Sequence, residues 1–278
     1  MMKTGLWKKV TGVALVGALA LSLAACGSSS ASSTKKADTK TGLAALKEKG
    51  TITVGMMAAT PPYEYHLVQG GKDQIVGSDI QLLDKVAKEL GVKYEIKDMD
   101  FDGLLVALQG KKIDMIISAM SPTAERAKNA DFTDVYYKGR NVMLVRKGDV
   151  NKYKTAKDFA NARLTTIKTS VQEGIIEKEL PNAQLKLLGK STEEAIDLAN
   201  NKVDGALVDI PTAILLTRGN PNIALSKVYF EDPSAGAAIA MPKGTDPEIM
   251  KAINKVIKES KPQYEEWLKK ATNNVKDI

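Results

Sequence analysis

Residues 108–137 read LQGKKIDMIISAMSPTAERAKNADFTDVYY, and the fold prediction depends on the pattern in this stretch. The apolar run KIDMIIS predicts a strand over residues 112–118, and small residues follow it. Arg126 comes next, where a short helix is expected to begin. An arginine on a helix surface is usually solvated, but an arginine beside a strand end can instead face a ligand.

Strand-like and helix-like segments alternate along most of the chain, which predicts an α/β fold with largely parallel sheets. Ser191 and Glu194 form a Ser-x-x-Glu pattern, which predicts a capping box at the start of one helix. The predicted strands cover residues 51–55, 92–99, 112–118, 163–168, 183–188 and 203–208. The predicted helices cover residues 78–91, 101–110, 171–180 and 191–201.

One pattern occurs twice: a helix end, a turn, a lysine, a β-branched residue and an aspartate before an apolar strand. The copies are LQGKKID at residues 108–114 and LANNKVD at residues 198–204. Any helix-turn-strand unit can show this pattern, so the two copies can be a coincidence. The alternative is that the chain forms two similar lobes, each with its own sheet. Ligands of open α/β sheets bind beyond the carboxyl ends of the strands. Those ends are at residues 118–119 and 208–209.

The first 25 residues are predicted to be a signal peptide. Lys3, Lys8 and Lys9 precede a charge-free apolar run that is shorter than the about 20 residues of a membrane span. The single cysteine, Cys26, has no partner for an internal disulfide. It follows Leu-Ala-Ala directly and resembles the lipobox of bacterial lipoproteins, which implies a lipid such as palmitate on Cys26. The alternative is a buried free thiol.

Residues 26–42 are predicted to be the lipidated cysteine and a flexible tether. The sequence GSSSASSTKKADTKT has almost no apolar content, and a coil of this length spans roughly 20 Å. The net charge of +7 comes mostly from the signal and the tether, because 34 basic and 32 acidic residues nearly balance from Gly42 onward. A basic stripe with interleaved aromatic residues is missing, so no nucleic-acid partner is expected.

Opposite charges are expected at the two strand ends. Arg126 offers a planar fork of donors that suits a carboxylate, and amides near Ser121 at a helix start would favour an anion. Asp209 supplies a negative charge at the other strand end. The pair predicts a zwitterion site, with the carboxylate against Arg126 and the ammonium group against Asp209.

The chain resembles the bacterial amino-acid-binding proteins of ABC importers, solute-binding protein family 3. The resemblance implies a two-lobed, periplasmic-binding-protein-like (type II) α/β fold, in which two mixed or parallel sheets with flanking helices are joined by two hinge strands. Lobe 1 would comprise residues 43–138 plus 236–278 and lobe 2 residues 139–235, with crossings near residues 137–142 and 231–238. The matching stretches are PPYEY, IVGSDIQLLDKVAKELGV, DMDFDGLLVALQGKKIDMIIS, SPTAERAKNADFTDVYY, VDGALVD and AIAMPKG.

The resemblance also implies roles for single residues. Arg126 would hold the ligand carboxylate and Asp209 its ammonium group, while Ser121 would contact both and Ala119 would offer its carbonyl to the ammonium. The other positions implied at the ligand are Phe101, which would stack on its aliphatic part, Gln172, which would give an amide from lobe 2, and Ser118, Met57, Thr60 and Lys168.

Two departures from the family pattern bear on the ligand. Met57 stands where the family often has an acid, and Thr60 stands where it often has an aromatic lid, so the case for a basic side chain is weaker. Lys168 falls where glutamine-binding relatives use a lysine, although a solvated strand-end lysine is the alternative. A Lys168 inside the pocket would favour glutamine, glutamate or asparagine. Lysine and arginine are the alternative ligands.

The function implied is capture of a free amino acid by lobe closure and its delivery to an ABC permease. The protein would be a monomeric lipoprotein on the extracellular face of the cell membrane, with no cofactor or metal. A dehydratase-like enzyme and a sensor module are the rival functions. His66 is the single histidine, in HLVQGGKDQ, which is expected to be an exposed loop, so neither histidine catalysis nor a zinc site is expected. A sensor would continue into a membrane helix, whereas YEEWLKKATNNVKDI near residue 278 is polar.

Overall fold

The structure is a computed structural model, and it describes residues 42–274. These residues belong to a unit that spans Thr39–Ile278. The predictions of a signal peptide, of a lipid at Cys26 and of a tether up to residue 41 lie outside the described residues. Residue 42, the last of the predicted tether, is the first residue of helix α1 (Gly42–Lys49).

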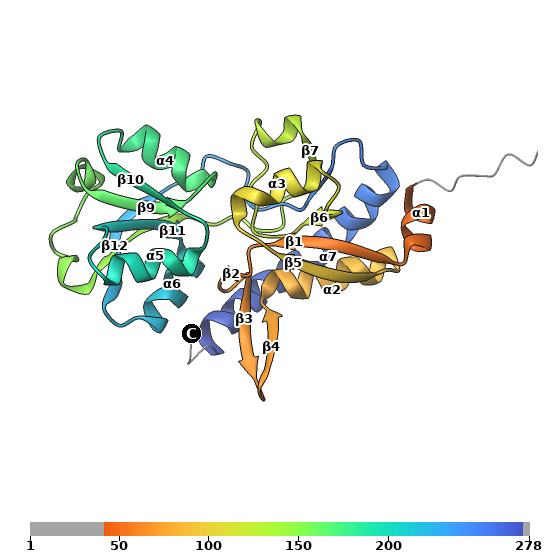
Figure 1. The fold of residues 1–278 in the computed structure, drawn as a ribbon, viewed down its shortest axis with the longest axis horizontal. Helices are drawn as coiled ribbons and strands as arrows, with labels where there is room; N and C mark the ends of the chain where they lie inside the picture. The colour runs from red at the N-terminus through yellow and green to blue at the C-terminus, as the bar shows by residue number, and fades with distance from the viewer. Residues whose placement is uncertain (1–41, 275–278) are drawn as a thin grey trace, which may run out of the picture. The chain divides into compact units, whose positions relative to one another are not determined.

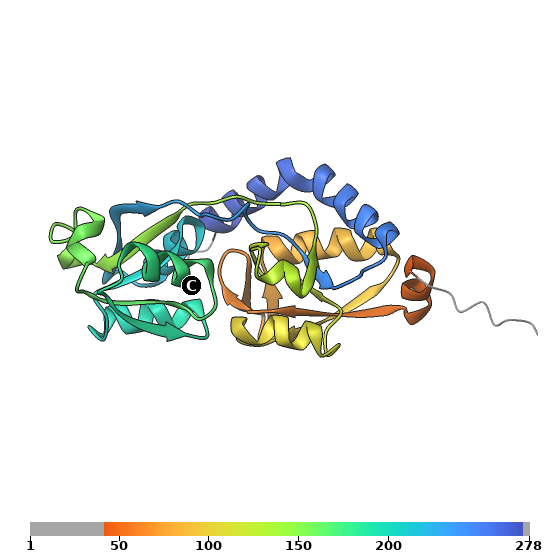
Figure 2. The ribbon, with the colours of Figure 1, turned by 90° about the horizontal axis from the view of Figure 1, so that it is seen from above.

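The first sheet has five strands in the order β5-β1-β6-β13-β7. Strand β1 is parallel to β5 and β6, while β13 is antiparallel to β6 and β7. Figure 2 shows α2 and α7 on one side of β1 and α3 on the other. The strands are β1 (Thr51–Met56), β5 (Lys93–Asp98), β6 (Met115–Ile116), β7 (Ala130–Phe132) and β13 (Ala240–Pro242), and the helices are α2 (Ser78–Leu90), α3 (Phe101–Gln109) and α7 (Pro247–Asn274).

The second sheet also has five strands, in the order β10-β9-β11-β8-β12. Strand β9 is parallel to β10 and β11, and β8 is antiparallel to β11 and β12. The strands are β8 (Asn141–Arg146), β9 (Arg163–Ile167), β10 (Gln184–Leu188), β11 (Gly205–Asp209) and β12 (Ile223–Phe230). The helices are α4 (Val171–Glu179), α5 (Ser191–Ala199) and α6 (Ile210–Gly219), with short 3-10 turns η1 (Arg126–Lys128), η2 (Lys147–Asp149) and η3 (Ala156–Phe159) along the chain.

The chain passes between the two sheets twice, once after β7 and once after β12 (Figure 1). The two passages run side by side, because Ala237 N donates to Tyr137 O at 2.7 Å and Tyr136 N donates to Ala237 O at 2.9 Å. We call the part built on the first sheet lobe 1 and the part built on the second sheet lobe 2. The predicted two-lobed α/β fold with mixed sheets is confirmed.

The repeated sequence pattern has the same structural role in both lobes. Asp114 N donates to Thr53 O at 2.7 Å, and its carboxylate accepts Thr53 N at 2.8 Å. Asp204 N donates to Arg163 O at 2.6 Å, and its carboxylate accepts Arg163 N at 3.1 Å. Each aspartate therefore fixes the start of a strand against its parallel neighbour, so the repeated pattern has the same local role in both lobes.

Two local predictions are wrong. The expected exposed loop around His66 is a hairpin of β3 (Glu64–Gln69) and β4 (Lys72–Val76), which forms a third sheet with β2 (Ala59–Thr60). Its turn is Gly70-Gly71, and both glycines have positive φ, 60° and 76°. This is the conformation that a two-residue hairpin turn needs and that glycine adopts readily.

The strand expected over residues 112–118 is shorter than predicted. Only Met115–Ile116 pairs as β6, and it pairs with two neighbours, β1 and β13. The chain turns away at Ala119, which has a positive φ of 45°. The residues after the strand therefore form an irregular segment at the carboxyl edge of the sheet, where a ligand can reach its backbone.

Candidate ligand-binding site

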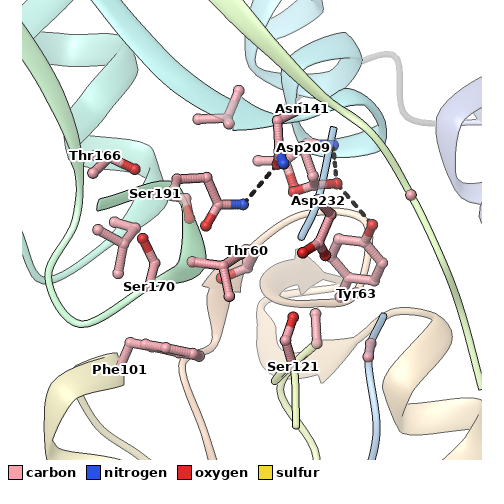
Figure 3. Close-up of a pocket in the computed structure, with 18 of the residues that line it drawn as sticks. Thr60, Tyr63, Phe101, Ser121, Asn141, Thr166, Ser170, Ser191, Asp209 and Asp232 are labelled. Atoms are coloured by element: carbon pink, nitrogen blue, oxygen red, sulfur yellow. Dashed lines mark hydrogen bonds between the residues drawn. The ribbon is translucent and has the colours of Figure 1, made fainter. Parts of the chain in front are cut away.

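A cavity of about 100 Å³ lies where the carboxyl ends of strands from both sheets meet. We call it the interlobe pocket, and Figure 3 shows its side chains. Lobe 1 contributes Met57, Thr60, Tyr63, Phe101, Ser118, Ala119, Ser121 and Arg126. The lobe 2 wall includes Asn141, Thr166, Ser170, Gln172, Ser191, Glu194, Asp209 and Thr212, and the passages between the lobes add Tyr137, Asp232 and Gly236.

Arg126 is a buried cation of the lobe 1 wall, with 9% of its surface exposed. Its Nη1 donates to Ser121 O at 2.6 Å, and its Nη2 donates to Thr169 O of lobe 2 at 2.7 Å. The guanidinium carbon lies 5.4 Å from the centre of the Phe101 ring, within the range of a cation–π contact. Burial lowers the pKa of Arg126 to about 10, against a smaller opposing effect of the charge of Asp232, so the group stays positive at neutral pH.

Asp209 is the anion that faces this cation from lobe 2. It ends β11 and is the N-cap of α6, where its Oδ2 accepts Thr212 N at 3.3 Å. The same oxygen accepts the Tyr63 hydroxyl of lobe 1 at 2.7 Å, as the dashed line in Figure 3 shows. Burial raises the pKa of Asp209, and the two hydrogen bonds partly offset this effect. Nearby polar groups therefore already orient the carboxylate.

The lobe 2 wall contains buried polar atoms that have no hydrogen-bonding partner among the described residues. They are Asn141 Nδ2, Thr212 Oγ1 and both carboxyl oxygens of Glu194. Asn141 pairs directly with Asp209 on the neighbouring strand, and its Oδ1 accepts Gln172 Nε2 at 2.9 Å. Buried polar groups are nearly always hydrogen-bonded. A cluster of exceptions around one cavity indicates a surface that is built for a polar ligand.

The backbone at Ala119 is held by a second buried carboxylate. Asp79 at the start of α2 accepts Ala119 N at 3.0 Å and the Tyr136 hydroxyl at 3.0 Å, and it also accepts the Tyr264 hydroxyl of α7. Ser118 is fixed in the same way, because its Oγ donates to Glu64 Oε1 at 2.7 Å and accepts Met57 N at 3.0 Å. This network makes the end of β6 a rigid part of the pocket.

Nine of the ten residues predicted to bind the ligand line the interlobe pocket, namely Met57, Thr60, Phe101, Ser118, Ala119, Ser121, Arg126, Gln172 and Asp209. Lys168 does not. Its Nζ lies 2.8 Å from Asp102 Oδ2 of lobe 1, with 56% of its side chain exposed. Thr169, the next residue, has a positive φ of 61° and turns the chain at the end of β9.

A short helix begins at Arg126, as expected, but it is the 3-10 turn η1 of three residues and provides no helix dipole for an anion. One further expectation about the site fails. Ser191 and Glu194 do not form a capping box, because Lys190 is the N-cap of α5. Ser191 is already inside the helix, so this residue and Glu194, one turn later, are both buried at the pocket.

Several lining residues were not anticipated from the sequence. Tyr63 and Tyr137 both line the pocket. The Ser-x-x-Glu pattern was the one sequence signal for Glu194, and it was assigned a capping role. Asn141, Thr166, Ser170, Thr212 and Asp232 have no local pattern that distinguishes them from ordinary strand or turn residues.

Within residues 42–274 no three histidine, cysteine, aspartate or glutamate side chains come together as a metal site. None of the helices described in that range combines the length and the apolar character that a membrane crossing requires.

Comparisons with known proteins agree on one family. Residues 52–273 match the bacterial extracellular solute-binding proteins, family 3. The arginine-binding extracellular protein ArtP of Bacillus subtilis is 32% identical over 91% of this chain and 92% of its own. Other relatives are named as binding proteins for L-cystine and for glutamine.

The similar solved structures are also amino-acid-binding proteins. AbpA, an amino acid ABC transporter substrate-binding protein of Streptococcus pneumoniae bound to L-arginine, superposes with a TM-score of 0.79 at 34% identity, covering 83% of this chain and 98% of AbpA. The ancestral amino acid-binding protein AncCDT-1, described as a precursor of cyclohexadienyl dehydratase, has a TM-score of 0.74 at 27% identity and covers 83% and 99%. The chain belongs to the bacterial extracellular solute-binding proteins of family 3, within the amino-acid-binding branch that serves ABC transporters.

Proposed function

We propose that this protein captures one free amino acid in the interlobe pocket and delivers it to the permease of an ABC transporter. The observation that carries the proposal is the pair of opposite charges in one cavity, with Arg126 from lobe 1 and Asp209 from lobe 2. Three of the five guanidinium N–H donors remain for a carboxylate once Ser121 O and Thr169 O are bound. The Asp209 carboxylate suits an ammonium group.

A ligand held in this way contacts both lobes, so it binds more tightly when they are together. It shifts the balance between open and closed forms only by that difference in affinity. The passages after β7 and β12 are short segments that can absorb a rotation of the lobes, as in other domain closures around ligands. A permease can then distinguish the loaded closed form from the empty one.

Two classes of ligand compete for the side-chain part of the pocket. The sequence favours glutamine, glutamate and asparagine only through Lys168, and Lys168 pairs with Asp102 outside the lining of the pocket. Lysine and arginine are favoured by the charges of the lining, which has three acids, Glu194, Asp209 and Asp232, against the single cation Arg126. We therefore prefer the basic class.

We further infer that binding is not followed by a chemical reaction. Glu194 is a buried acid at the pocket, and such groups occur in acid–base catalysis, so the dehydratase-like alternative keeps one observation in its favour. The relatives named above are binding proteins, and the charge pair suffices for binding alone. A ligand recovered unchanged after prolonged incubation would support binding, and a converted product would identify an enzyme.

A thermal-shift screen of the purified protein against the twenty amino acids tests the proposal. A bound ligand raises the unfolding temperature by an amount that grows with its concentration relative to the dissociation constant. We expect one amino acid, or a few of similar charge, to raise it clearly, and mass spectrometry of the same samples to show the amino acid unchanged. If none of the twenty shifts the transition at millimolar concentration, the proposed function is wrong.

We also propose that Cys26 carries a lipid that holds the protein, as a monomer, at the outer face of the membrane. The support is the position of Cys26 after Leu-Ala-Ala. Cys26→Ser should move the protein from the membrane fraction to the medium and abolish labelling with radioactive palmitate. Unchanged membrane association of the variant would contradict the lipid. A light-scattering mass equal to two or more times the mass of the mature chain would contradict the monomer.

A further inference from the structure

Glu194 is an acid in the interlobe pocket that is not needed to bind the carboxylate or the ammonium group of an amino acid. It lies on α5 three residues after Ser191, on the same face of the helix, and both residues line the cavity. Its side chain is fully buried, at 0% exposure, and neither carboxyl oxygen has a hydrogen-bonding partner among residues 42–274. An isolated buried carboxylate is costly, so a natural partner for it is expected.

The charges of the pocket show which kind of partner fits. An amino acid's own carboxylate and ammonium groups engage Arg126 and Asp209. Glu194 and Asp232 then remain, and both are acids. Asp232 acts on Arg126, whereas the charge that acts on Glu194 is that of Asp209, which has the same sign. Glu194 is thus the acid of the pocket whose negative charge has no positive group among the described residues to balance it.

We propose that Glu194 is the side-chain subsite of the pocket and binds the guanidinium or ammonium group of a basic amino acid. This inference rests on the proposed function, because it assumes that the backbone groups of the ligand are held by Arg126 and Asp209. The unpaired Thr212 Oγ1 lies on the same wall as a further acceptor. A planar guanidinium forms two parallel hydrogen bonds to one carboxylate, so arginine would satisfy both oxygens of Glu194.

The proton on Glu194 gives the inference a second, independent consequence. Burial, with a smaller contribution from Asp209, raises the pKa of Glu194 well above its usual value. A cationic side chain binds the ionised form, so binding releases a proton and affinity increases as pH rises through this pKa. Asp197, three residues further along α5, is already paired with Lys186 and Lys202.

Asp209 also titrates in the pocket, and burial raises its pKa as well. It faces the ammonium group of every amino acid, however, and its contribution is the same for charged and neutral ligands. The remaining titratable groups around the pocket are Arg126, which is positive over the tested range, Tyr63 and Tyr137, whose pKa values are raised by burial, and Asp232. Comparison of two ligands of equal shape therefore isolates Glu194.

The test compares L-arginine with L-citrulline, which has the same shape but a neutral side-chain end. Calorimetry should show that the intact protein binds arginine more tightly than citrulline. Glu194→Gln should weaken arginine binding by at least about tenfold and change citrulline binding by less than about threefold, because only the charged contact is lost. Glu193→Gln is the matched control, since it removes the same charge from the exposed neighbouring position of α5 and should alter neither ligand.

Proton release is measured in the same experiment by repeating the titrations in two buffers of different ionisation enthalpy. Arginine should release more protons than citrulline from the intact protein, and this excess should vanish in Glu194→Gln. Equal binding of arginine and citrulline by the intact protein, or equal weakening of both by Glu194→Gln, would overturn the inference while leaving amino-acid capture in place. A stronger response to glutamine than to arginine would point to a protonated Glu194 that donates to a neutral amide. Absence of binding by every amino acid would instead refute the proposed function.

Discussion

At the scale of single residues, the pocket holds its two key charges with contacts that leave room for a ligand. Arg126 uses one donor group within its own lobe and one across the pocket, and Asp209 accepts hydrogen bonds from one residue of each lobe. Each charge is therefore oriented before a ligand arrives. Such preorganisation lowers the entropy lost on binding.

Removal of either charge should abolish tight binding and preserve the fold. We expect Arg126→Ala and Asp209→Asn to weaken amino-acid binding by two orders of magnitude or more, because loss of one partner of a buried ion pair costs roughly 3–5 kcal/mol. Asparagine at position 209 keeps a good N-cap for α6. Calorimetry measures the affinity, and circular dichroism checks the fold.

Two exposed lysines serve as controls for this prediction. Lys128 lies in the same 3-10 turn as Arg126, and Lys168 forms the exposed pair with Asp102. An exposed ion pair contributes about 0–1 kcal/mol, so Lys128→Ala and Lys168→Ala should change affinity by less than about fivefold. Near-normal affinity in Arg126→Ala or Asp209→Asn would remove that residue from the site, and a large loss in Lys168→Ala would return Lys168 to it.

At the scale of elements, the second passage between the lobes depends on one glycine. Gly236 has a φ of +116°, and a Cβ placed there would lie 2.4 Å from Tyr137 O of the first passage. The next residue, Ala237, makes the backbone hydrogen bonds that join the two passages. Both the positive φ and the close approach require a residue without a Cβ.

We expect Gly236→Ala to lower the free energy of unfolding by about 1–3 kcal/mol, the usual cost of a strained backbone conformation, and to weaken ligand binding as the passages move apart. Gly148→Ala in η2 is the control, because a Cβ at Gly148 would meet nothing within 4 Å. Urea denaturation measures both variants. Equal stability of Gly236→Ala and the unmodified protein would show that the passage has another accessible conformation.

At the scale of the whole molecule, polar contacts between described residues join lobe 1 to lobe 2, among them Lys190 with Asp98 at 4.0 Å and three contacts around the pocket. Tyr63 donates to Asp209, Arg126 donates to Thr169 O, and Lys168 pairs with Asp102. The first two involve the groups that are proposed to bind the ligand. A closed arrangement is therefore favoured to some degree without a ligand, and the ligand adds to this balance by its differential affinity.

Loss of the Tyr63 hydroxyl should shift the ligand-free protein toward an open form. We expect Tyr63→Phe to increase the radius of gyration in small-angle X-ray scattering without ligand, and saturating ligand to return it to the value of the unmodified protein. The control is Tyr94→Phe, which removes a tyrosine–aspartate hydrogen bond of the same 2.7 Å length within lobe 1. An unchanged scattering curve for ligand-free Tyr63→Phe would mean that this contact does not influence closure.

Local periodicity determined the central strands β1, β5, β9, β10 and β11 and the helices α2, α3, α4 and α5 of this protein. The alternation of strand and helix patterns, the repeat at residues 108–114 and 198–204, and the charges at Arg126 and Asp209 are all visible in the sequence. These features depend on near neighbours in the chain, because strand and helix periods and the turns between them are set within a few residues. The Gly70-Gly71 turn was equally readable, and its hairpin was missed.

Only the tertiary structure decided which side chains face the pocket. Asn141 lies beside Asp209 because β8 pairs antiparallel with β11, and no local pattern specifies that pairing. Lys168 lies outside the lining of the pocket because it pairs with Asp102 of the other lobe. Glu194 was assigned to a helix cap, and the packing of α5 between the second sheet and β2 turns it into the cavity instead. Whether a side chain points into a pocket between two lobes depends on contacts between residues far apart in the chain. A single sequence does not specify these contacts.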